Sequence, residues 1–268
     1  MKGDRISING KIVPFGDSGL TPEELLSSNF IYQKIHTLGY RTLQSEWAAE
    51  IADMSCKALY DCPAGFTRES LAKEVEALLA ANRYPPASTL VTLYLIPGYG
   101  DGPPARLLSC EKQLVYKGYA VATGISCVAV PYEYPFWPHK TAISLAAHTY
   151  AAGYARRQGF DGAIAENAAG VMTGFGENPL YAVAGHKVLT PSIDCGAADS
   201  VERRLGIMAC EDAGLTVCEH SVSSTEAAGF DEIFSVTPQG ITSIQQLGDR
   251  LFPHSFAKNL LPYLKRYQ

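Results

Sequence analysis

The sequence predicts an α/β (α+β) protein of two domains, a smaller one over residues 1–116 and a larger one over residues 117–268. Three observations predict this class. Segments with apolar residues at helical spacing alternate with β-rich runs, and no internal repeat or low-complexity tract interrupts them. The third is size: 268 residues with 47% hydrophobic content can bury a substantial core. We place the domain boundary near Tyr116.

The smaller domain is predicted to contain helices and a sheet. Residues 1–20 read as a short strand pair, and Thr21-Pro22-Glu23-Glu24 then supplies an N-cap, a proline at the first helical position and a capping glutamate. Residues 45–59 and 67–83 carry apolar residues at helical spacing. Residues 88–96 form a β-rich run that a Pro-Gly pair closes, so a strand is expected there.

Two strand-like runs, residues 107–118 and 119–130, are predicted around the domain boundary. An aromatic and proline-rich segment, PYEYPFWPHK, then ends in Lys140. A helix over 141–157 is indicated by one face that carries Ile143, Ala147, Tyr150, Ala151 and Tyr154. Residues 161–190 break into short strands at glycine and asparagine, and a helix over 200–213 and strands at 215–219 and 232–244 follow.

Charge and composition exclude several classes of protein. The net charge is -5, and no run of Lys or Arg is longer than Arg156-Arg157, so a nucleic-acid partner is not expected. The sequence offers neither the apolar segment of a signal peptide nor a window of about 18 apolar residues, which predicts a cytoplasmic protein with no membrane partner. The seven cysteines are scattered, and we interpret most of them as small buried hydrophobic residues.

The motifs of three other kinds of functional site are incomplete in this sequence. The glycine-rich run at residues 98–102 follows a strand, but Pro103 and Pro104 come where a phosphate-binding helix would begin, so a plain turn is predicted. None of the six histidines has the spacing of a metal-ligand pair, and no serine lies in a nucleophile elbow. We therefore expect neither a metal site nor a serine hydrolase.

From Lys140 the run KTAISLAAHTYAAGYARRQGFDGAIAENAAGVMTGFGENPLYAVAGHKVLTP resembles the class IV aminotransferases, the family of branched-chain and D-amino-acid aminotransferases and of aminodeoxychorismate lyase. The shared features are a lysine before an alanine-rich helix, a Gly-Phe-Asp turn and a strand ending in Gly-Glu-Asn. The segments ISINGKIVPFG, NFIYQKIHTLGYRTL and TVCEHSVSSTEAAGFDEIFSVTPQGITSI are also similar, so the likeness covers nearly the whole chain.

The resemblance implies a homodimer with a barrel-like C-terminal domain, pyridoxal 5'-phosphate as cofactor, and an amino acid and 2-oxo acid as substrates. Lys140 would be the lysine that forms the imine with the cofactor, which requires a pKa well below the ordinary lysine value. The cofactor would be bound by Thr173, Ser200, Val201, Thr237 and Pro238, while Tyr32 and Gln33 would face the substrate.

Four positions depart from the family pattern. Thr173 replaces a glutamate that pairs with the pyridine nitrogen, and a hydroxyl cannot hold a proton there. Glu50 occupies the position of the arginine that binds the cofactor phosphate in the family, and Trp47 that of a common histidine. Arg41 lies a few residues away and is a candidate to replace the phosphate-binding arginine. Glu50 is equally well explained as an exposed helix residue. Leu145 replaces a tyrosine.

The remaining departure is at the helix predicted from residue 200, where the family presents a Gly-Ile-Thr turn to the phosphate. Asp199 and Glu202 are spaced as a capping box, which would fill the phosphate-binding N–H groups. Ser200 and Val201 would remain donors if Asp199 points away. Two hypotheses follow. One is a pyridoxal-phosphate enzyme that acts on an amino acid through Lys140, as a transaminase, lyase or racemase. The other is a catalytically silent homologue that binds another ligand. The retained lysine and the intact Gly-Glu-Asn and Thr-Pro-Gln segments favour the enzyme.

Overall fold

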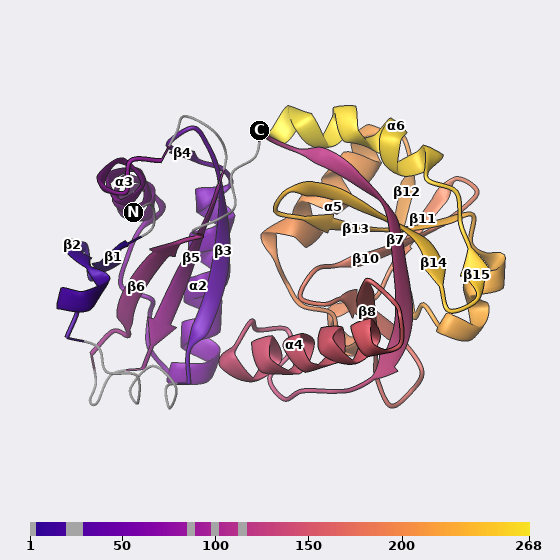
Figure 1. Cartoon of the computed structure of the whole chain (residues 1–268), viewed down its shortest axis with the longest axis horizontal. Coiled ribbons are helices and arrows are strands. Elements are labelled where there is room, and N and C mark those ends of the chain that lie inside the picture. Colours follow the sequence, from indigo (N-terminus) through magenta and orange to yellow (C-terminus); the bar gives the residue numbers. More distant parts are fainter. Residues whose placement is uncertain (1–3, 20–28, 85–88, 98–101, 112–116) are drawn as a thin grey trace. The chain divides into compact units, whose positions relative to one another are not determined.

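The computed structural model describes residues 4–19, 29–84, 89–97, 102–111 and 117–268. The chain divides into two compact units, Met1–Gly118 and Tyr119–Gln268, each with its own sheet and helices (Figure 1). The boundary predicted near Tyr116, the helix predicted from Thr21 and residues 98–101 of the predicted turn lie outside the described residues.

The first unit is a six-stranded sheet in the order β2-β1-β6-β5-β3-β4, in which every neighbouring pair is antiparallel. Two helices contact each other and pack against this sheet. The strands are β1 (Arg5–Ile8), β2 (Lys11–Pro14), β3 (Ile31–Leu38), β4 (Arg41–Thr42), β5 (Leu90–Ile96) and β6 (Ala105–Cys110), and the helices are η1 (Phe15–Asp17), α2 (Ser45–Tyr60) and α3 (Arg68–Ala81).

Helices α2 and α3 begin and end near the predicted residues because their signals are local. The Thr67 hydroxyl accepts from the Ser70 N–H, and the Ser70 hydroxyl accepts from the Thr67 N–H, so a reciprocal capping box starts α3. The buried side of α2 is formed by small and branched residues at helical spacing, Ala48, Ile51, Ala52, Ser55 and Cys56. The predictions of helices at 45–59 and 67–83 and of a strand at 88–96 are confirmed to within a few residues.

The second unit contains a nine-stranded curled sheet in the order β12-β11-β10-β13-β14-β7-β8-β9, with β15 paired to β14 (Figure 1). Pairs β11/β12, β14/β7 and β7/β8 are parallel, and the other pairs are antiparallel. The strands are β7 (Ala120–Pro131), β8 (Gly162–Glu166), β9 (Met172–Phe175), β10 (Leu180–Ala184), β11 (Lys187–Thr190), β12 (Thr216–Glu219), β13 (Glu232–Thr237), β14 (Gly240–Leu247) and β15 (Arg250–Leu251).

Three α-helices accompany this sheet. Helix α4 packs on β8 and β7, while α5 and α6 contact each other, with α5 beside β12 and β13 and α6 against β14. They are α4 (Ala142–Arg157), α5 (Val201–Asp212) and α6 (Ser255–Leu264), and the short 3-10 helices are η2 (Ile193–Cys195), η3 (Ser224–Gly229) and η4 (Lys265–Tyr267).

The face of α4 that is buried differs from the predicted one. Ser144, His148, Ala151 and Ala155 form the buried side. Of the five residues predicted to share a face, Ile143, Tyr150 and Tyr154 are exposed, Tyr150 by 79%. The small residues allow α4 to lie close to β8, and a tyrosine at such a position would hold the helix away from the sheet.

The run predicted as one strand over residues 232–244 is two antiparallel strands, β13 and β14, paired from Ile233↔Ile244 to Thr237↔Gly240. Gly240 lies at the start of β14 with a φ of 127°, and a Cβ there would overlap the backbone of Ala120. Only glycine adopts this conformation without strain, so the hairpin turns at this point.

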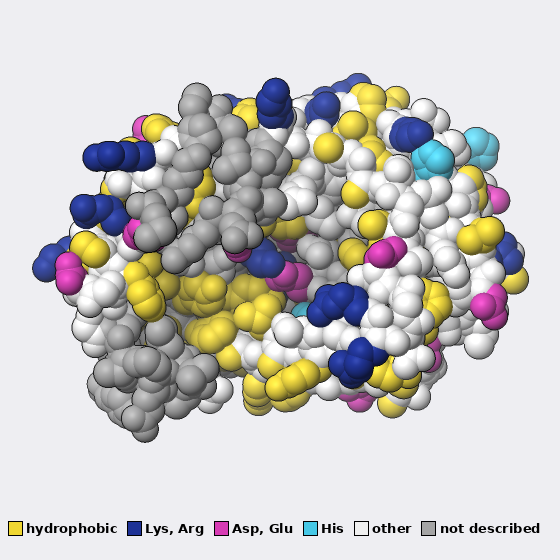
Figure 2. Space-filling model, in the orientation of Figure 1, with side chains coloured by type: hydrophobic (Ala, Val, Ile, Leu, Met, Phe, Trp, Pro, Cys, Tyr) yellow, Lys and Arg dark blue, Asp and Glu magenta, His cyan; other side chains and the backbone are white. Residues whose placement is uncertain are grey.

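No described helix is both long and apolar enough to cross a membrane. On the face shown in Figure 2, the described Lys and Arg side chains are scattered among other residues and form no continuous basic patch. All seven cysteines are free thiols, and four of them, Cys56, Cys110, Cys127 and Cys210, are buried, as predicted.

Candidate functional site

Lys140 lies directly before α4, and only 3% of it is exposed. The start of this helix is fixed by a second reciprocal capping box, in which the Thr141 hydroxyl accepts from the Ser144 N–H and the Ser144 hydroxyl accepts from the Thr141 N–H. The Asp199 N–H donates to the Pro138 carbonyl at 3.2 Å, which ties the chain before Lys140 to the chain before α5. These contacts place the lysine beside the N-terminus of α5.

The Lys140 ammonium forms ion pairs with two carboxylates. Its Nζ lies 3.5 Å from Glu202 Oε2 and 4.0 Å from Glu177 Oε2, and both carboxyl side chains are largely buried. Burial lowers the pKa of Lys140, but the charges of Glu202 and Glu177 outweigh burial and raise its pKa above the ordinary lysine value. The lysine is therefore held in its charged form.

The capping box predicted from Asp199 and Glu202 is wrong. Ser200 is the N-cap of α5, and its hydroxyl accepts from the Arg203 N–H at 3.1 Å. Asp199 pairs instead with Arg204, at 3.1 Å from its Nη2, and Glu202 turns to Lys140. Local spacing suggested the cap, but the Asp199 N–H already donates to the Pro138 carbonyl, and the buried Lys140 ammonium attracts the Glu202 carboxylate.

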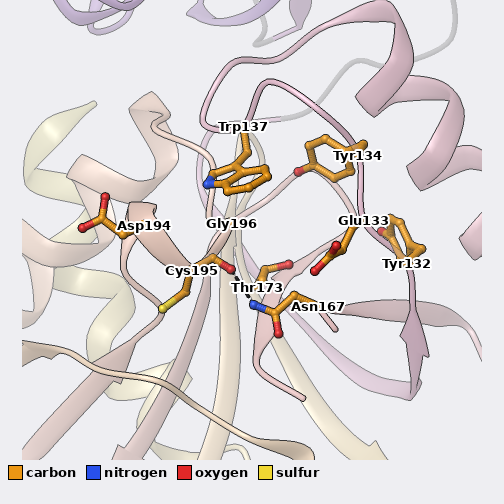
Figure 3. Close-up of a pocket in the computed structure, with 9 residues that line it drawn as sticks. All are labelled: Tyr132, Glu133, Tyr134, Trp137, Asn167, Thr173, Asp194, Cys195 and Gly196. Carbon is orange, nitrogen blue, oxygen red and sulfur yellow. Dashed lines mark hydrogen bonds between the residues drawn. The ribbon is translucent and has the colours of Figure 1, made fainter. Parts of the chain in front are cut away.

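Thr173 lies on β9 and lines a pocket of about 80 Å³ (Figure 3). Its hydroxyl donates weakly to the Ala165 carbonyl, at 3.5 Å. The other lining residues are Tyr132, Glu133, Tyr134, Trp137, Asn167, Asp194, Cys195 and Gly196. Lys140 is not among the residues that line this pocket.

Thr237 and Pro238 lie at the end of β13, in the turn that leads into β14. The Thr237 hydroxyl donates to the Gly240 carbonyl and accepts from the Gln239 N–H, both at 3.3 Å. Both hydrogen bonds of the Thr237 hydroxyl are therefore made within its own turn. Whether it also approaches a ligand stays a prediction.

The substrate-facing pair predicted in the first unit lies on β3, where both Tyr32 and Gln33 are buried. Successive residues of a strand point to opposite faces of the sheet, so only one of the two can face a given ligand. In the same unit Glu50 is an exposed residue of α2, Trp47 is half-buried on that helix, and Arg41 is exposed on β4.

Sequence reasoning missed the acidic and aromatic wall of the pocket, although it singled out the segment PYEYPFWPHK as unusual. Tyr132, Glu133, Tyr134 and Trp137 all come from that segment. It also missed that Glu177, read only as part of the Gly-Glu-Asn run, reaches Lys140. The dense aromatic composition before the lysine, with Glu133 among the aromatic residues, was the available signal. Among the described residues, no three His, Cys, Asp or Glu side chains gather as they would around a metal ion.

Solved structures with the same fold are branched-chain aminotransferases. The enzyme from Thermoproteus uzoniensis, solved with norvaline, has a TM-score of 0.85 at 18% identity over 98% of this chain and 94% of that one. The Escherichia coli enzyme has a TM-score of 0.82 at 17% identity over 97% and 92%. The Thermobaculum terrenum enzyme, solved in its PLP form, has a TM-score of 0.82 at 18% identity over 99% and 94%.

Among curated proteins none matches the sequence. The model of the family described as amino-transferase class IV matches residues 53–247, which is most of the chain and includes Lys140, Thr173, Glu202 and Thr237. Together with the curled sheet and the lysine at the start of α4, this match shows that the chain belongs to the class IV aminotransferase family.

Proposed function

We propose that this chain is a catalytically silent member of the class IV aminotransferase family, which keeps the fold and the buried lysine but binds a small molecule other than pyridoxal phosphate. One observation carries the proposal: the Lys140 ammonium is held between the carboxylates of Glu202 and Glu177. An imine forms only from a neutral amine, and this pairing keeps the amine protonated.

The residues present do not fit pyridoxal phosphate. The phosphate would have to approach the N-terminus of α5, where the buried Glu202 carboxylate already lies beside Lys140. Two carboxylates around one ammonium leave a net negative charge there, which repels a phosphate dianion. Arg203 and Arg204 do not offset this charge, because their guanidinium groups pair with Glu219 and Asp199.

The ring end of such a cofactor fits no better. Thr173 stands where the family resemblance implies a glutamate that keeps the pyridine nitrogen protonated. A hydroxyl supplies no negative charge, so a ring bound against it would be a weak electron sink. The protein therefore lacks, around both ends of the cofactor, the charges that the cofactor's chemistry needs.

A second candidate function is pyridoxal-phosphate-dependent transamination of a branched-chain or D-amino acid, in a homodimer. Two observations favour it: Lys140 is buried at the start of α4 in a chain of this family, and the similar Thermobaculum terrenum enzyme was solved in its PLP form. A related possibility is lyase chemistry, which demands less of the ring.

An absorbance titration with pyridoxal phosphate separates the two candidates. We expect the wild-type protein to give the same spectrum as Lys140→Ala, with no imine band at any cofactor concentration. The Thermobaculum terrenum enzyme serves as the positive control for the band. An imine band that appears in the wild type and is absent from Lys140→Ala would overturn the silent assignment and support the second candidate.

A further inference from the structure

The pocket that contains Thr173 is negatively charged and partly aromatic. Its lining includes two acidic residues, Glu133 and Asp194, and three aromatic residues, Tyr132, Tyr134 and Trp137, but no Lys, Arg or His. In Figure 3 the Asp194 carboxylate points away from Glu133 and Thr173, so Glu133 supplies the negative charge that faces the pocket. Clefts lined by one sign of charge concentrate ligands of the opposite sign. The lining therefore disfavours an anion and favours a cation.

The walls of this pocket are fixed by hydrogen bonds. The Asn167 amide donates to the Cys195 carbonyl at 2.8 Å, and its oxygen accepts from the Val171 N–H, which anchors the segment that carries Asp194. On the other side, the Tyr132 hydroxyl is 2.8 Å from His148 Nδ1 on α4. These two sides of the pocket are therefore ordered before a ligand enters.

The groups that remain for a ligand converge on one space. Glu133 accepts from the Ala168 N–H at 2.7 Å through one carboxylate oxygen. In Figure 3 its carboxylate points toward the Thr173 hydroxyl, with the Trp137 indole above them. Burial raises the pKa of Tyr134 to about 12, so its phenol remains neutral and adds an aromatic wall.

We propose that this pocket binds a small organic cation through a primary ammonium group, held by the Glu133 carboxylate, the Thr173 hydroxyl and the face of Trp137. A carboxylate and a hydroxyl accept the ammonium N–H groups, and an indole is the aromatic ring that attracts a cation most strongly. At about 80 Å³ the pocket is far smaller than the roughly 300 Å³ or more of typical drug-sized sites, so the cation has only a few non-hydrogen atoms. This assignment rests on the proposed function and deepens it by naming the class of ligand.

The probe is ethylammonium, observed through the indole N–H signals of the two tryptophans in nuclear magnetic resonance spectra. We expect a saturable shift of the Trp137 signal, with a dissociation constant on the order of millimolar for so small a ligand. The signal of Trp47, outside the pocket lining, should stay in place, and Trp47→Phe assigns the two signals. No saturable shift of the Trp137 signal would overturn the assignment.

Two comparisons on the wild-type protein test the chemistry of the ligand. The neutral analogue 1-propanol has a similar size, so equal binding of 1-propanol would overturn the role of charge. Tighter binding of tetramethylammonium, or of acetate, than of ethylammonium would overturn the assignment to a primary ammonium. We expect ethylammonium to bind most tightly of the four.

Substitutions test the residues. Glu133→Gln keeps an oxygen for the Ala168 N–H but removes the charge, and it should weaken ethylammonium binding about 10- to 100-fold. The exposed Glu211→Gln on α5 is the matched control and should bind normally. Equal affinity of Glu133→Gln and wild type would contradict the proposal.

The cofactor test remains separate from this one. If the wild-type protein binds no ethylammonium and also forms no imine band with pyridoxal phosphate, only the proposed ligand class is refuted. An imine band on Lys140 would refute the silent assignment itself.

Discussion

Lys140 Nζ lies 3.5 Å from Glu202 Oε2, and the two side chains are 3% and 5% exposed. The residues are 62 positions apart in the chain, and the N-terminus of α5 is held beside the lysine segment by the Asp199–Pro138 backbone bond. A charged lysine is stabilised here by protein carboxylates, at the helix end where the family resemblance implies a cofactor phosphate.

Breaking this ion pair should destabilise the protein. Lys140→Met leaves two buried carboxylates without a cation, so we expect a loss of about 3–5 kcal/mol in the free energy of unfolding. Glu202→Gln should cost less, because Glu177 remains near the ammonium. The double variant should show a coupling energy of about 1–3 kcal/mol, measured by denaturant unfolding.

The exposed pair Arg266–Asp212, at 3.4 Å, is the matched control for this cycle. Its coupling should not exceed about 1 kcal/mol. Additive effects of Lys140→Met and Glu202→Gln would show that the buried pair makes no net interaction.

Two substitutions that change the charge around Lys140 and Thr173 should create an affinity for pyridoxal phosphate. Glu202→Thr removes the carboxylate that holds Lys140 and occupies the N-terminus of α5, and Thr173→Glu supplies a negative charge at the pocket. We expect the double variant to form an imine that borohydride fixes, whereas the wild type forms none. Adding Lys140→Ala must abolish the signal, and a double variant that folds without forming an imine would mean that other residues block the cofactor.

His36 should make stability depend on pH. Burial on β3 lowers the pKa of His36 from 6.5 to about 4, so the unfolded chain binds a proton that the folded chain does not. Its stability contribution is complete above pH 6.5 and is lost as the pH falls toward 4, by up to about 3 kcal/mol. Denaturant unfolding of wild type and His36→Gln across this range measures the difference.

The stability of wild type relative to His36→Gln should fall as the pH drops from 6.5 toward 4, because the substituted protein lacks the titrating group. His186→Gln, at an exposed position of the second unit, is the matched control substitution. Parallel profiles for wild type and His36→Gln would contradict the assigned role of His36.

Two helical glycines should respond oppositely to alanine. A Cβ at Gly206 on α5 would overlap the hydroxyl and ring of Tyr181, which is fully buried and stacked on Phe234 at 5.0 Å. We expect Gly206→Ala to lower the free energy of unfolding by about 1–3 kcal/mol, despite the better helix propensity of alanine. Thermal or denaturant unfolding measures the change.

Gly153 on α4 is the matched control, since its nearest atoms are the ends of flexible arginine side chains, Arg157 at 3.7 Å and Arg156 at 3.9 Å. Gly153→Ala should stabilise the protein by about 0.5–1 kcal/mol. Stabilisation by both substitutions would mean that Tyr181 moves aside without cost.

The elements that the sequence predicts best are those with local signals. Helix α3 is capped by Thr67 and Ser70, three residues apart, and its bounds follow from that spacing. Helix α6 was not predicted, because it contains Pro262 and its cap comes from a distant strand: Glu232 on β13 accepts from the N–H groups of Phe256 and Ala257. A pattern within one segment carries no trace of such a partner.

The candidate site shows the same difference between features with local signals and features that depend on distant residues. The sequence identified Lys140, Thr173 and Glu202 as positions that matter, since each lies in a segment that resembles the family. It assigned Glu202 to a local cap, whereas the fold brings Glu202 to a buried lysine that precedes another helix. Spacing rules describe neighbours along the chain, while burial of a charge depends on which elements pack together.

The most direct test of a silent Lys140 is covalent. The wild-type protein is incubated with saturating pyridoxal phosphate, reduced with borohydride and digested, and the peptide that contains Lys140 is examined by mass spectrometry, with the Thermobaculum terrenum enzyme treated in parallel. We predict an unmodified Lys140 in this protein and a modified lysine in the control. A pyridoxyl adduct on Lys140 would contradict the account, because it would show that the amine leaves Glu202 and reacts as a free base.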